Sequence, residues 1–313
     1  MRVVFMGTPG FAVASLNEIH TNSNHEVVGV VTVPDKPAGR GQKLNISDVK
    51  KYALEHDLPL LQPEKLKNED FIQELQALNA DVFVVVAFRM LPKVVWSMPN
   101  KGTFNLHGSL LPQYRGAAPI NWAVMNGDSV TGVTTFLIDE EIDTGNILLS
   151  DKVQINENDN VGFIHDQLME IGSRLVVKTL DGLENDNLKP QPQDESIELK
   201  HAPKIFKEDC KIDWTKSIET IHNKIRGLSP YPGAWTTYGN DDKFKSLKIL
   251  AGAKTSLEKE GDIFEIVRTK NNVYINLEDG MYEIIELQPE GKRKMSAKDF
   301  INGSQNEPRL FIK

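Results

Sequence analysis

One apolar run without alternation constrains the fold of this chain more than any other stretch. Residues Asp81–Ala87 read Asp-Val-Phe-Val-Val-Val-Ala. A strand with one face in water alternates polar and apolar residues, whereas a parallel strand covered by helices on both faces does not. The run therefore predicts a central strand of an α/β sheet.

The start of the chain fits the same architecture. The apolar run Arg2–Met6 leads into Gly7-Thr-Pro-Gly10, and apolar residues from Phe11 to Ile19 follow with helical spacing. Strand, glycine turn and helix are the opening of a doubly wound α/β domain. The glycines do not form the G-x-G-x-x-G pattern and no acidic residue ends the next strand, so we do not predict a nicotinamide cofactor.

Periodicity and capping signals predict the remaining elements of this domain. We expect a helix capped by Ser47 that ends at His56, and a strand that begins near Thr103. The other predicted strands are Glu26–Val33, Leu58–Gln62 and Gly132–Ile138, and the other predicted helices are Glu69–Leu78, Ile120–Met125 and Val161–Leu180.

A second domain is predicted where the periodicity changes. Residues 181–206 are polar and contain several prolines, which is typical of a linker, so we divide the chain into domains 1–206 and 207–313. A helix through Ile218 and Leu228 opens the second domain, and a last helix follows 291–295. Short alternating runs between them predict a small antiparallel barrel of the OB type. The five predicted strands are 234–238, 244–251, 262–267, 273–277 and 282–287.

Net charge, cysteine count and the length of the apolar runs exclude several classes of protein. The net charge is −8 over 313 residues, which argues against a protein that coats nucleic acid nonspecifically. The acidic excess lies in residues 1–206, because 207–313 carry 18 basic and 17 acidic residues. The single cysteine, Cys210, allows no internal disulfide and no cysteine cluster, and no apolar run approaches the length of a membrane span. We therefore expect a cytoplasmic protein.

Three polar residues form a candidate catalytic group. Asn105 and His107 alternate with Phe104 and Leu106, so they share one face of the predicted strand. Asp143 lies in the loop after a later strand, and we expect the strand ends to bring the three together. An amide, an imidazole and a carboxylate are suited to stabilising an oxyanion and moving a proton in acyl transfer.

Other interpretations of these residues stay open at this point. His107 could be a buried structural histidine, and the acidic residues 139–143 could be a solvated loop or a cation site. That loop does not match an EF-hand. The chain has neither the G-x-S-x-G turn of a serine hydrolase around Ser109 nor an H-E-x-x-H grouping.

Two basic segments are candidates for phosphate binding. The loop Pro34–Leu44 contains Lys36, Arg40 and Lys43 among glycines and prolines, and it could bind phosphates or be a solvated insertion. Three adjacent cations, Lys292, Arg293 and Lys294, precede the last predicted helix. They are a modest phosphate-binding signal.

The motifs together resemble the folate-dependent formyltransferases. Asn105-Leu-His-Gly-Ser-Leu-Leu-Pro-Gln-Tyr-Arg-Gly-Ala-Ala-Pro119 and Asp139-x-x-x-Asp-Thr-Gly145 carry this resemblance. Pro37-Ala-Gly-Arg-Gly-Gln-Lys-Leu44 and Leu287-Gln-Pro-Glu-Gly-Lys-Arg-Lys-Met295 narrow it to the members that act on methionyl-tRNA. It implies a Rossmann-like catalytic domain, an OB-like C-terminal tRNA-binding domain, and formyl transfer from 10-formyltetrahydrofolate to the α-amino group of initiator methionyl-tRNA for translation initiation.

The resemblance also implies roles for individual residues. Asn105, His107 and Asp143 match the family's catalytic residues, and the basic residues named above match its tRNA-binding segments. We expect a monomer, no metal and no covalent enzyme intermediate. Formylation of a small amine and a catalytically silent RNA-binding module are the alternatives. The folate contacts that it implies are Ser109, Leu110, Leu111 and Pro112, with Phe88, Arg89, Met90 and Leu91.

Overall fold

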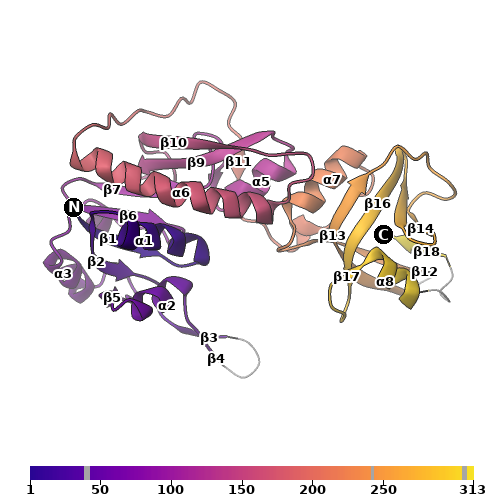
Figure 1. Ribbon diagram of the computed structural model, residues 1–313, viewed down its shortest axis with the longest axis horizontal. Helices are drawn as coiled ribbons and strands as arrows, with labels where there is room; N and C mark the ends of the chain where they lie inside the picture. The colour runs from indigo at the N-terminus through magenta and orange to yellow at the C-terminus, as the bar shows by residue number, and fades with distance from the viewer. Residues whose placement is uncertain (39–42, 241–242, 305–308) are drawn as a thin grey trace. The chain divides into compact units, whose positions relative to one another are not determined.

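A computed structural model describes residues 1–38, 43–240, 243–304 and 309–313. The chain divides into two compact units, each described here by itself (Figure 1). The first unit is Met1–Pro119, Thr131–Val153 and Asp166–His201, and the second is Ile120–Val130, Gln154–His165 and Ala202–Lys313. Two short segments that precede residue 202 in the sequence, 120–130 and 154–165, therefore belong to the second unit.

The first unit is built on a seven-stranded sheet. Its strand order is β10-β9-β7-β6-β1-β2-β5. The core strands β1 (Arg2–Gly7), β2 (Glu26–Val31), β5 (Leu60–Leu61), β6 (Val82–Val86) and β7 (Thr103–His107) pair in parallel. All five residues of β6 are buried, as the unalternating run predicts. The predicted doubly wound α/β fold is confirmed.

The predicted helices before residue 201 lie close to their observed positions, and the short helix α4 (Lys93–Trp96) was not predicted. The hydroxyl of Ser47 accepts a hydrogen bond from the Lys50 backbone N–H, which confirms the predicted cap. The elements are α1 (Gly10–Asn22), α2 (Asp48–Glu55), α3 (Glu69–Ala77), α4 (Lys93–Trp96), α5 (Pro119–Met125) and α6 (Val161–Glu184), with β8 (Arg115–Gly116), β9 (Val130–Leu137), β10 (Ile147–Gln154) and β11 (His201–Ala202).

Strand β10, at the edge of this sheet, was not predicted from the sequence. The strand reads Ile-Leu-Leu-Ser-Asp-Lys-Val-Gln, and most of its second half is exposed. An edge strand with charged residues lacks the alternation on which the prediction depends. The prediction also ended α6 four residues early, at Leu180 instead of Glu184.

Helix α6 covers the face of the sheet opposite Asn105. A Cβ at Gly172 would lie 2.9 Å from the Leu106 side chain, so this glycine lets α6 approach β7 closely. Leu106 points away from Asn105 and His107 because strand residues alternate. In the β6–β7 register Asn105 lies beside Val85, which packs in the core cluster with Phe71 and Leu75 of α3.

The loop Pro34–Leu44 contains a short hairpin. Strands β3 (Lys36–Ala38) and β4 (Lys43–Asn45) pair antiparallel, with Lys36 opposite Asn45. Arg40 lies outside the described residues. The prediction that this stretch is not helical is confirmed for the part that the structure describes.

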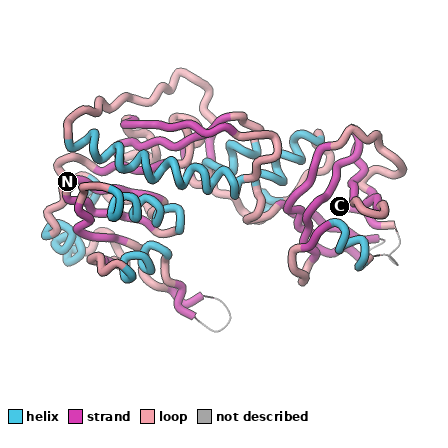
Figure 2. The backbone as a smooth tube through the Cα atoms, viewed as in Figure 1, coloured by secondary structure: helices cyan, strands magenta, loops and turns pink. Residues whose placement is uncertain are grey.

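The second unit is a closed barrel (Figure 2). Its strand order is β13-β12-β18-β14-β15-β16, and β13 also pairs with β16, which closes a ring of six strands. The OB-like barrel is confirmed, but the prediction of five strands was one short. The elements are η1 (Glu208–Cys210), α7 (Ile218–Gly227), β12 (Ala234–Asn240), β13 (Lys243–Lys254), β14 (Glu265–Arg268), β15 (Val273–Leu277), β16 (Gly280–Pro289), β17 (Met295–Ser296), α8 (Ala297–Gly303) and β18 (Leu310–Ile312).

Simple physical reasons explain why β18 was not predicted and why the last helix begins where it does. Strand β18 has three residues, which are too few to show a period of two. Helix α8 begins at Ala297 because Ser296 and Asp299 form a capping box. No described helix has the length and apolar character that crossing a membrane requires.

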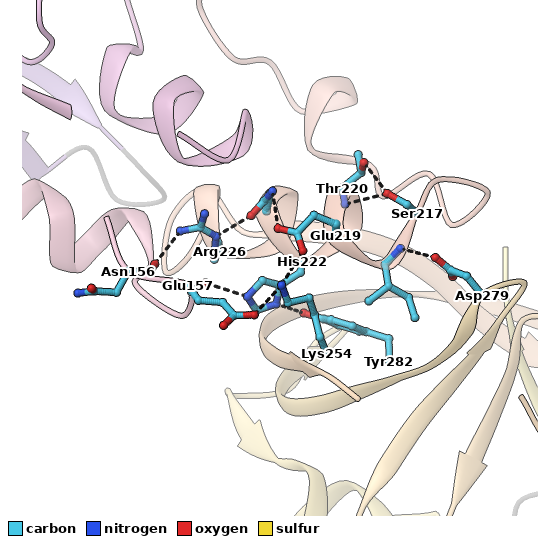
Figure 3. A network of polar contacts seen from close by, with 12 residues as sticks. Asn156, Glu157, Ser217, Glu219, Thr220, His222, Arg226, Lys254, Asp279 and Tyr282 are labelled. Carbon is cyan, nitrogen blue, oxygen red and sulfur yellow. Dashed lines mark hydrogen bonds and ion pairs between the residues drawn. The ribbon is translucent and has the colours of Figure 1, made fainter. Parts of the chain in front are cut away.

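A buried histidine joins α7 to the barrel and to the 154–160 segment (Figure 3). His222 Nε2 lies 3.1 Å from the Glu157 carbonyl oxygen and Nδ1 lies 3.1 Å from the Tyr282 hydroxyl. A carbonyl can only accept, so Nε2 carries the proton and Nδ1 accepts from Tyr282. Burial lowers the pKa of His222, and the nearby cations Arg226 and Lys254 lower it further.

This pairing predicts a loss of stability in acid. Because the folded pKa of His222 lies below its usual value of 6.5, the unfolded chain binds the proton first as the pH falls below about 6.5. The free energy of unfolding should then decrease by up to about 1.4 kcal/mol per pH unit from this group. Urea unfolding at pH 7.5 and 5.5 measures this decrease in the free energy of unfolding. His222→Gln should show a shallower pH dependence than His20→Gln, and equal slopes would contradict the assignment.

Candidate active site

The candidate site begins where β7 ends in a tight turn. His107 is the last residue of β7 and is 6% exposed. Its Nε2 lies 2.8 Å from the backbone carbonyl oxygen of Tyr114. Since that oxygen only accepts, Nε2 is the protonated nitrogen, and Nδ1 is left for a second partner.

The turn that supplies this carbonyl has a constrained backbone at Tyr114. Tyr114 has a φ of 62°, a left-handed conformation that a bulky residue rarely adopts. Its backbone N–H donates to the Lys200 carbonyl over 2.6 Å. These contacts fix the carbonyl that orients the imidazole ring of His107.

Asp143 faces the other nitrogen of His107. Its carboxylate Oδ2 lies 3.8 Å from His107 Nδ1, within ion-pair range but longer than a hydrogen bond. The same oxygen accepts a 2.9 Å hydrogen bond from the Gly116 backbone N–H. The structure therefore brings His107 and Asp143 together, although their positions differ by 36 in the sequence.

The chain brings Asp143 to the site by a different path than the sequence predicted. We expected parallel strand ends to gather the site, but β9 runs antiparallel to β7, with Leu137 opposite Phe104 and Thr134 opposite His107. The loop after β9 therefore starts at the far end of β7 and must fold back. Gly145 allows this fold, because a Cβ there would lie 1.7 Å from the Leu137 carbonyl oxygen.

Asn105 contributes an unsatisfied polar atom. Its side-chain Oδ1 is buried and has no hydrogen-bond partner within the part of the chain that the structure describes. A buried polar atom without a partner costs stability, and Asn105 is one of several described side chains with such an atom, so it marks a candidate site only together with its position beside His107. Asn105 shares a strand face with His107, and its Oδ1 is available to a hydrogen-bond donor on a ligand.

The turn Ser109–Pro112 is fixed by internal hydrogen bonds. Ser109 is fully buried, and its hydroxyl donates to the Gln113 carbonyl over 2.6 Å. The Thr134 hydroxyl donates to the Ser109 carbonyl and accepts from the Leu111 backbone N–H. Ser109 therefore shapes the turn, and Leu110 and Pro112 are its partly exposed members.

A cavity of about 460 Å³ lies beside the loop after β6. Arg89 is anchored there, because its guanidinium donates to the carbonyls of Pro63 and Glu64, and burial lowers its pKa. Met90 is 69% exposed, while Leu91 is buried and Phe88 packs against the neighbouring core. The lining residues are Leu66, Lys67, Arg89, Met90, Leu91, Pro92, Lys93, Trp96 and Glu140.

The acidic loop is organised by its own hydrogen bonds. The Asp139 carboxylate accepts from the Glu141 backbone N–H and the Thr144 hydroxyl. Glu140 pairs with Lys93, which lowers the pKa of Glu140. Among the described residues, the carboxylates of this loop form no group of three with metal-ligand spacing.

Three residues near Asp143 escaped the sequence analysis as site residues. Gln193 donates from Nε2 to the carbonyls of Asp143 and Gly145, and its Oε1 accepts from the Arg115 guanidinium. The Gly116 N–H binds the Asp143 carboxylate. Arg115 and Gly116 lie in the quoted motif, but Gln193 lies in a polar stretch with no periodic pattern.

The basic residues divide between the two units. Lys36 is exposed in the β3–β4 hairpin, while Arg40 and the side chain of Lys43 lie outside the description. The three cations 292–294 are exposed between β16 and β17, and there Lys294 pairs with Glu286.

Comparison with known proteins shows the family. The family model "Formyl transferase" matches residues 1–180, and "Formyl transferase, C-terminal domain" matches 204–305. A methionyl-tRNA formyltransferase of Flavobacterium psychrophilum is 50% identical over 303 residues, covering 97% of this chain and 96% of the relative. One of Bacteroides fragilis is 49% identical over 313 residues, covering 97% and 95%.

Solved structures share the fold. HypX from Aquifex aeolicus in complex with tetrahydrofolic acid aligns with a TM-score of 0.66 at 19% identity, covering 98% of this chain and 48% of that one. An N-formyltransferase from Helicobacter canadensis, in complex with folinic acid and dTDP-3-aminofucose, aligns with a TM-score of 0.62 at 23% identity, covering 94% and 99%. At these identities the likeness extends to the fold alone.

The unpaired amide oxygen of Asn105 predicts that this side chain lowers the stability of the folded protein. Asn105→Leu removes the unpaired buried acceptor with a side chain of similar shape, so the melting temperature should stay equal or rise. Thr134→Val is the matched control, because it removes a hydroxyl with two buried hydrogen bonds and should cost about 1–3 kcal/mol. Thermal unfolding of both variants measures the difference. Equal destabilisation would mean that Asn105 is an ordinary structural residue.

Proposed function

Because the chain belongs to the formyl transferase family, we propose that it transfers a formyl group from 10-formyltetrahydrofolate to the α-amino group of methionine on initiator methionyl-tRNA. The observation that carries this proposal is similarity at about half of all positions over 97% of the chain to proteins named methionyl-tRNA formyltransferase. The similarity covers both units, so the alternative of a small-amine formyltransferase is not favoured. The product would serve translation initiation.

The reaction needs groups that stabilise charge at the formyl carbon. The neutral methionyl amine attacks that carbon, its C–N bond forms, and the formyl oxygen becomes an oxyanion. Asn105 donates to this oxygen from its amide. His107 donates from Nδ1 when that nitrogen is protonated, since Nε2 is engaged by the Tyr114 carbonyl.

Asp143 completes the proton transfer. The amine loses a proton as it attacks, and the Asp143 carboxylate takes it directly or through one water. One oxygen of Asp143 is held by the Gly116 N–H, which leaves the other for this task. The bond between the formyl carbon and N10 of the folate then breaks, and the proton that Asp143 took from the amine passes to N10, directly or through one water. The nucleophile belongs to the substrate, so no covalent enzyme intermediate is required.

We assign the folate contacts to residues that were named from the sequence. The lining of the cavity at 89–93 includes the apolar residues Leu91, Pro92 and Trp96, which suit a flat pterin ring. The backbone around Met90 offers hydrogen-bonding groups to its edge. The turn Ser109–Pro112, which the Ser109 hydroxyl holds by its bond to the Gln113 carbonyl, does not line this cavity, and we assign it a separate contact with the folate.

The tRNA contacts follow the exposed basic residues. Lys36, Arg40 and Lys43 of the β3–β4 segment would bind phosphates near the acceptor end, and Lys292, Arg293 and Lys294 would bind the backbone elsewhere. We assign catalysis and the tRNA contacts of Lys36, Arg40 and Lys43 to domain 1–206, and the other tRNA contacts to domain 207–313. We place the protein in the cytoplasm as a monomer.

A transfer assay tests the function. With 10-formyltetrahydrofolate as donor, the purified chain should formylate initiator methionyl-tRNA, and mass spectrometry of the released amino acid should show N-formylmethionine. Free methionine, glycinamide ribonucleotide and an amino sugar nucleotide serve as competing acceptors. Preferential formylation of one of these small amines would overturn the proposal, and absence of any transfer would favour a silent RNA-binding protein.

The catalytic assignment predicts a selective loss of turnover. Asn105→Ala, His107→Ala and Asp143→Ala should each lower kcat by about 100-fold or more, because each removes a group that acts in the transition state. Binding of methionyl-tRNA, measured by filter retention, should change little. Glu141→Gln, in the same loop but exposed, is the control. Turnover near that of the unmodified protein in any of the three would remove that residue from the mechanism.

A further inference from the structure

The backbone at Asp143 is held in an unusual conformation. Its φ is 59°, in the left-handed region that residues with a side chain seldom occupy. Such a conformation persists only where neighbouring contacts impose it. The carboxylate contacts Gly116 and His107, but these bind the side chain and leave the peptide groups of the loop to another partner.

Gln193 is that partner. Its amide nitrogen donates one hydrogen bond to the Asp143 carbonyl over 2.8 Å and one to the Gly145 carbonyl over 2.9 Å. Both N–H groups of the amide are thus used, and both act on the loop that carries the carboxylate. Two bonds from one rigid group fix the separation of the two carbonyls.

The orientation of Gln193 is itself determined. Its Oε1 accepts from Arg115 Nε over 3.0 Å and from the terminal nitrogen over 2.8 Å. Arg115 also pairs with Glu195, and its side chain is 13% exposed. Since a guanidinium only donates, the amide cannot flip without facing N–H against N–H. Arg115 therefore decides which end of Gln193 faces the loop.

Gln193 lies in the stretch that we predicted as a linker. Around it the chain is hydrogen-bonded to the first unit, because Gln191 forms a two-bond bridge with Ile147 and the Lys200 N–H donates to the Gln113 side chain. Residues 191–200 are therefore held along the site by hydrogen bonds and are not a free linker. We call this segment the strap.

We propose that Gln193 is a positioning residue for formyl transfer, acting through Asp143. It holds the loop in the conformation that places the carboxylate beside His107, and Arg115 keeps it oriented. This inference rests on the proposed function for its kinetic consequence. Its structural consequence, an ordered loop at 139–146, does not depend on which acceptor the enzyme uses.

The test replaces donors by acceptors without changing shape. Gln193→Glu keeps the partner of Arg115 but loses both N–H donors and sets a carboxylate oxygen against two carbonyls. A misplacement of about 1 Å costs about 100-fold in rate, so kcat should fall 10- to 100-fold with the KM for methionyl-tRNA nearly unchanged. Gln191→Glu is the matched control, because among the described residues its side chain bonds the neighbouring Lys189 carbonyl and no group of the 139–146 loop.

A double-mutant cycle separates positioning from general damage. In an Asp143→Asn background, Gln193→Glu should cost less than threefold further, because the group it positions no longer takes the proton. A full additional loss in that background, or unchanged kcat in the single variant, would overturn the proposal.

Hydrogen exchange gives a readout that is independent of turnover. The Gly116 N–H is protected by the Asp143 carboxylate, so its exchange should be at least tenfold faster in Gln193→Glu than in Gln191→Glu. Equal exchange would overturn the positioning role even if formyl transfer is confirmed. Faster exchange in a protein that formylates no tRNA would support the strap and reject the proposed function.

Discussion

The hydrogen bond from the Gly116 backbone N–H to the Asp143 carboxylate is the contact on which the site depends. It joins the turn after β7 to the loop after β9, and these would otherwise lie at opposite ends of two antiparallel strands. His107 shares the same carboxylate at 3.8 Å. The left-handed conformations of Tyr114 and Asp143 are the local cost of this arrangement.

The sheet explains why the chemistry lies at this place. Buried strand β6 and helix α6 give β7 a rigid surrounding, so Asn105 and His107 are presented from a fixed strand rather than from a loop. The side-chain Oδ1 of Asn105 has no partner among the described residues, and because an amide oxygen only accepts, a donor on the substrate such as the attacking amine would satisfy it. The nucleophile comes with the substrate, which fits a site made of donors and one base.

Sequence reasoning predicted the parts of this protein that have strong local patterns. The run at 82–86, the cap at Ser47 and the alternation around Asn105 each act over a few residues. The strands β10 and β18 were missed because one is a charged edge and the other has three residues. Gln193 was missed for a different reason, since its role depends on partners 48 to 78 positions away, which no local pattern records.

The central claim is that the formyl group is transferred at Asn105, His107 and Asp143. A crystal structure with a stable analogue of 10-formyltetrahydrofolate tests it most directly. We expect the formyl oxygen within about 2.7–3.1 Å of the Asn105 amide nitrogen, with the pterin ring in the cavity at residues 89–93. A formyl group bound away from Asn105, with the pterin in another cavity such as that lined by Gln62 and Glu74, would contradict it.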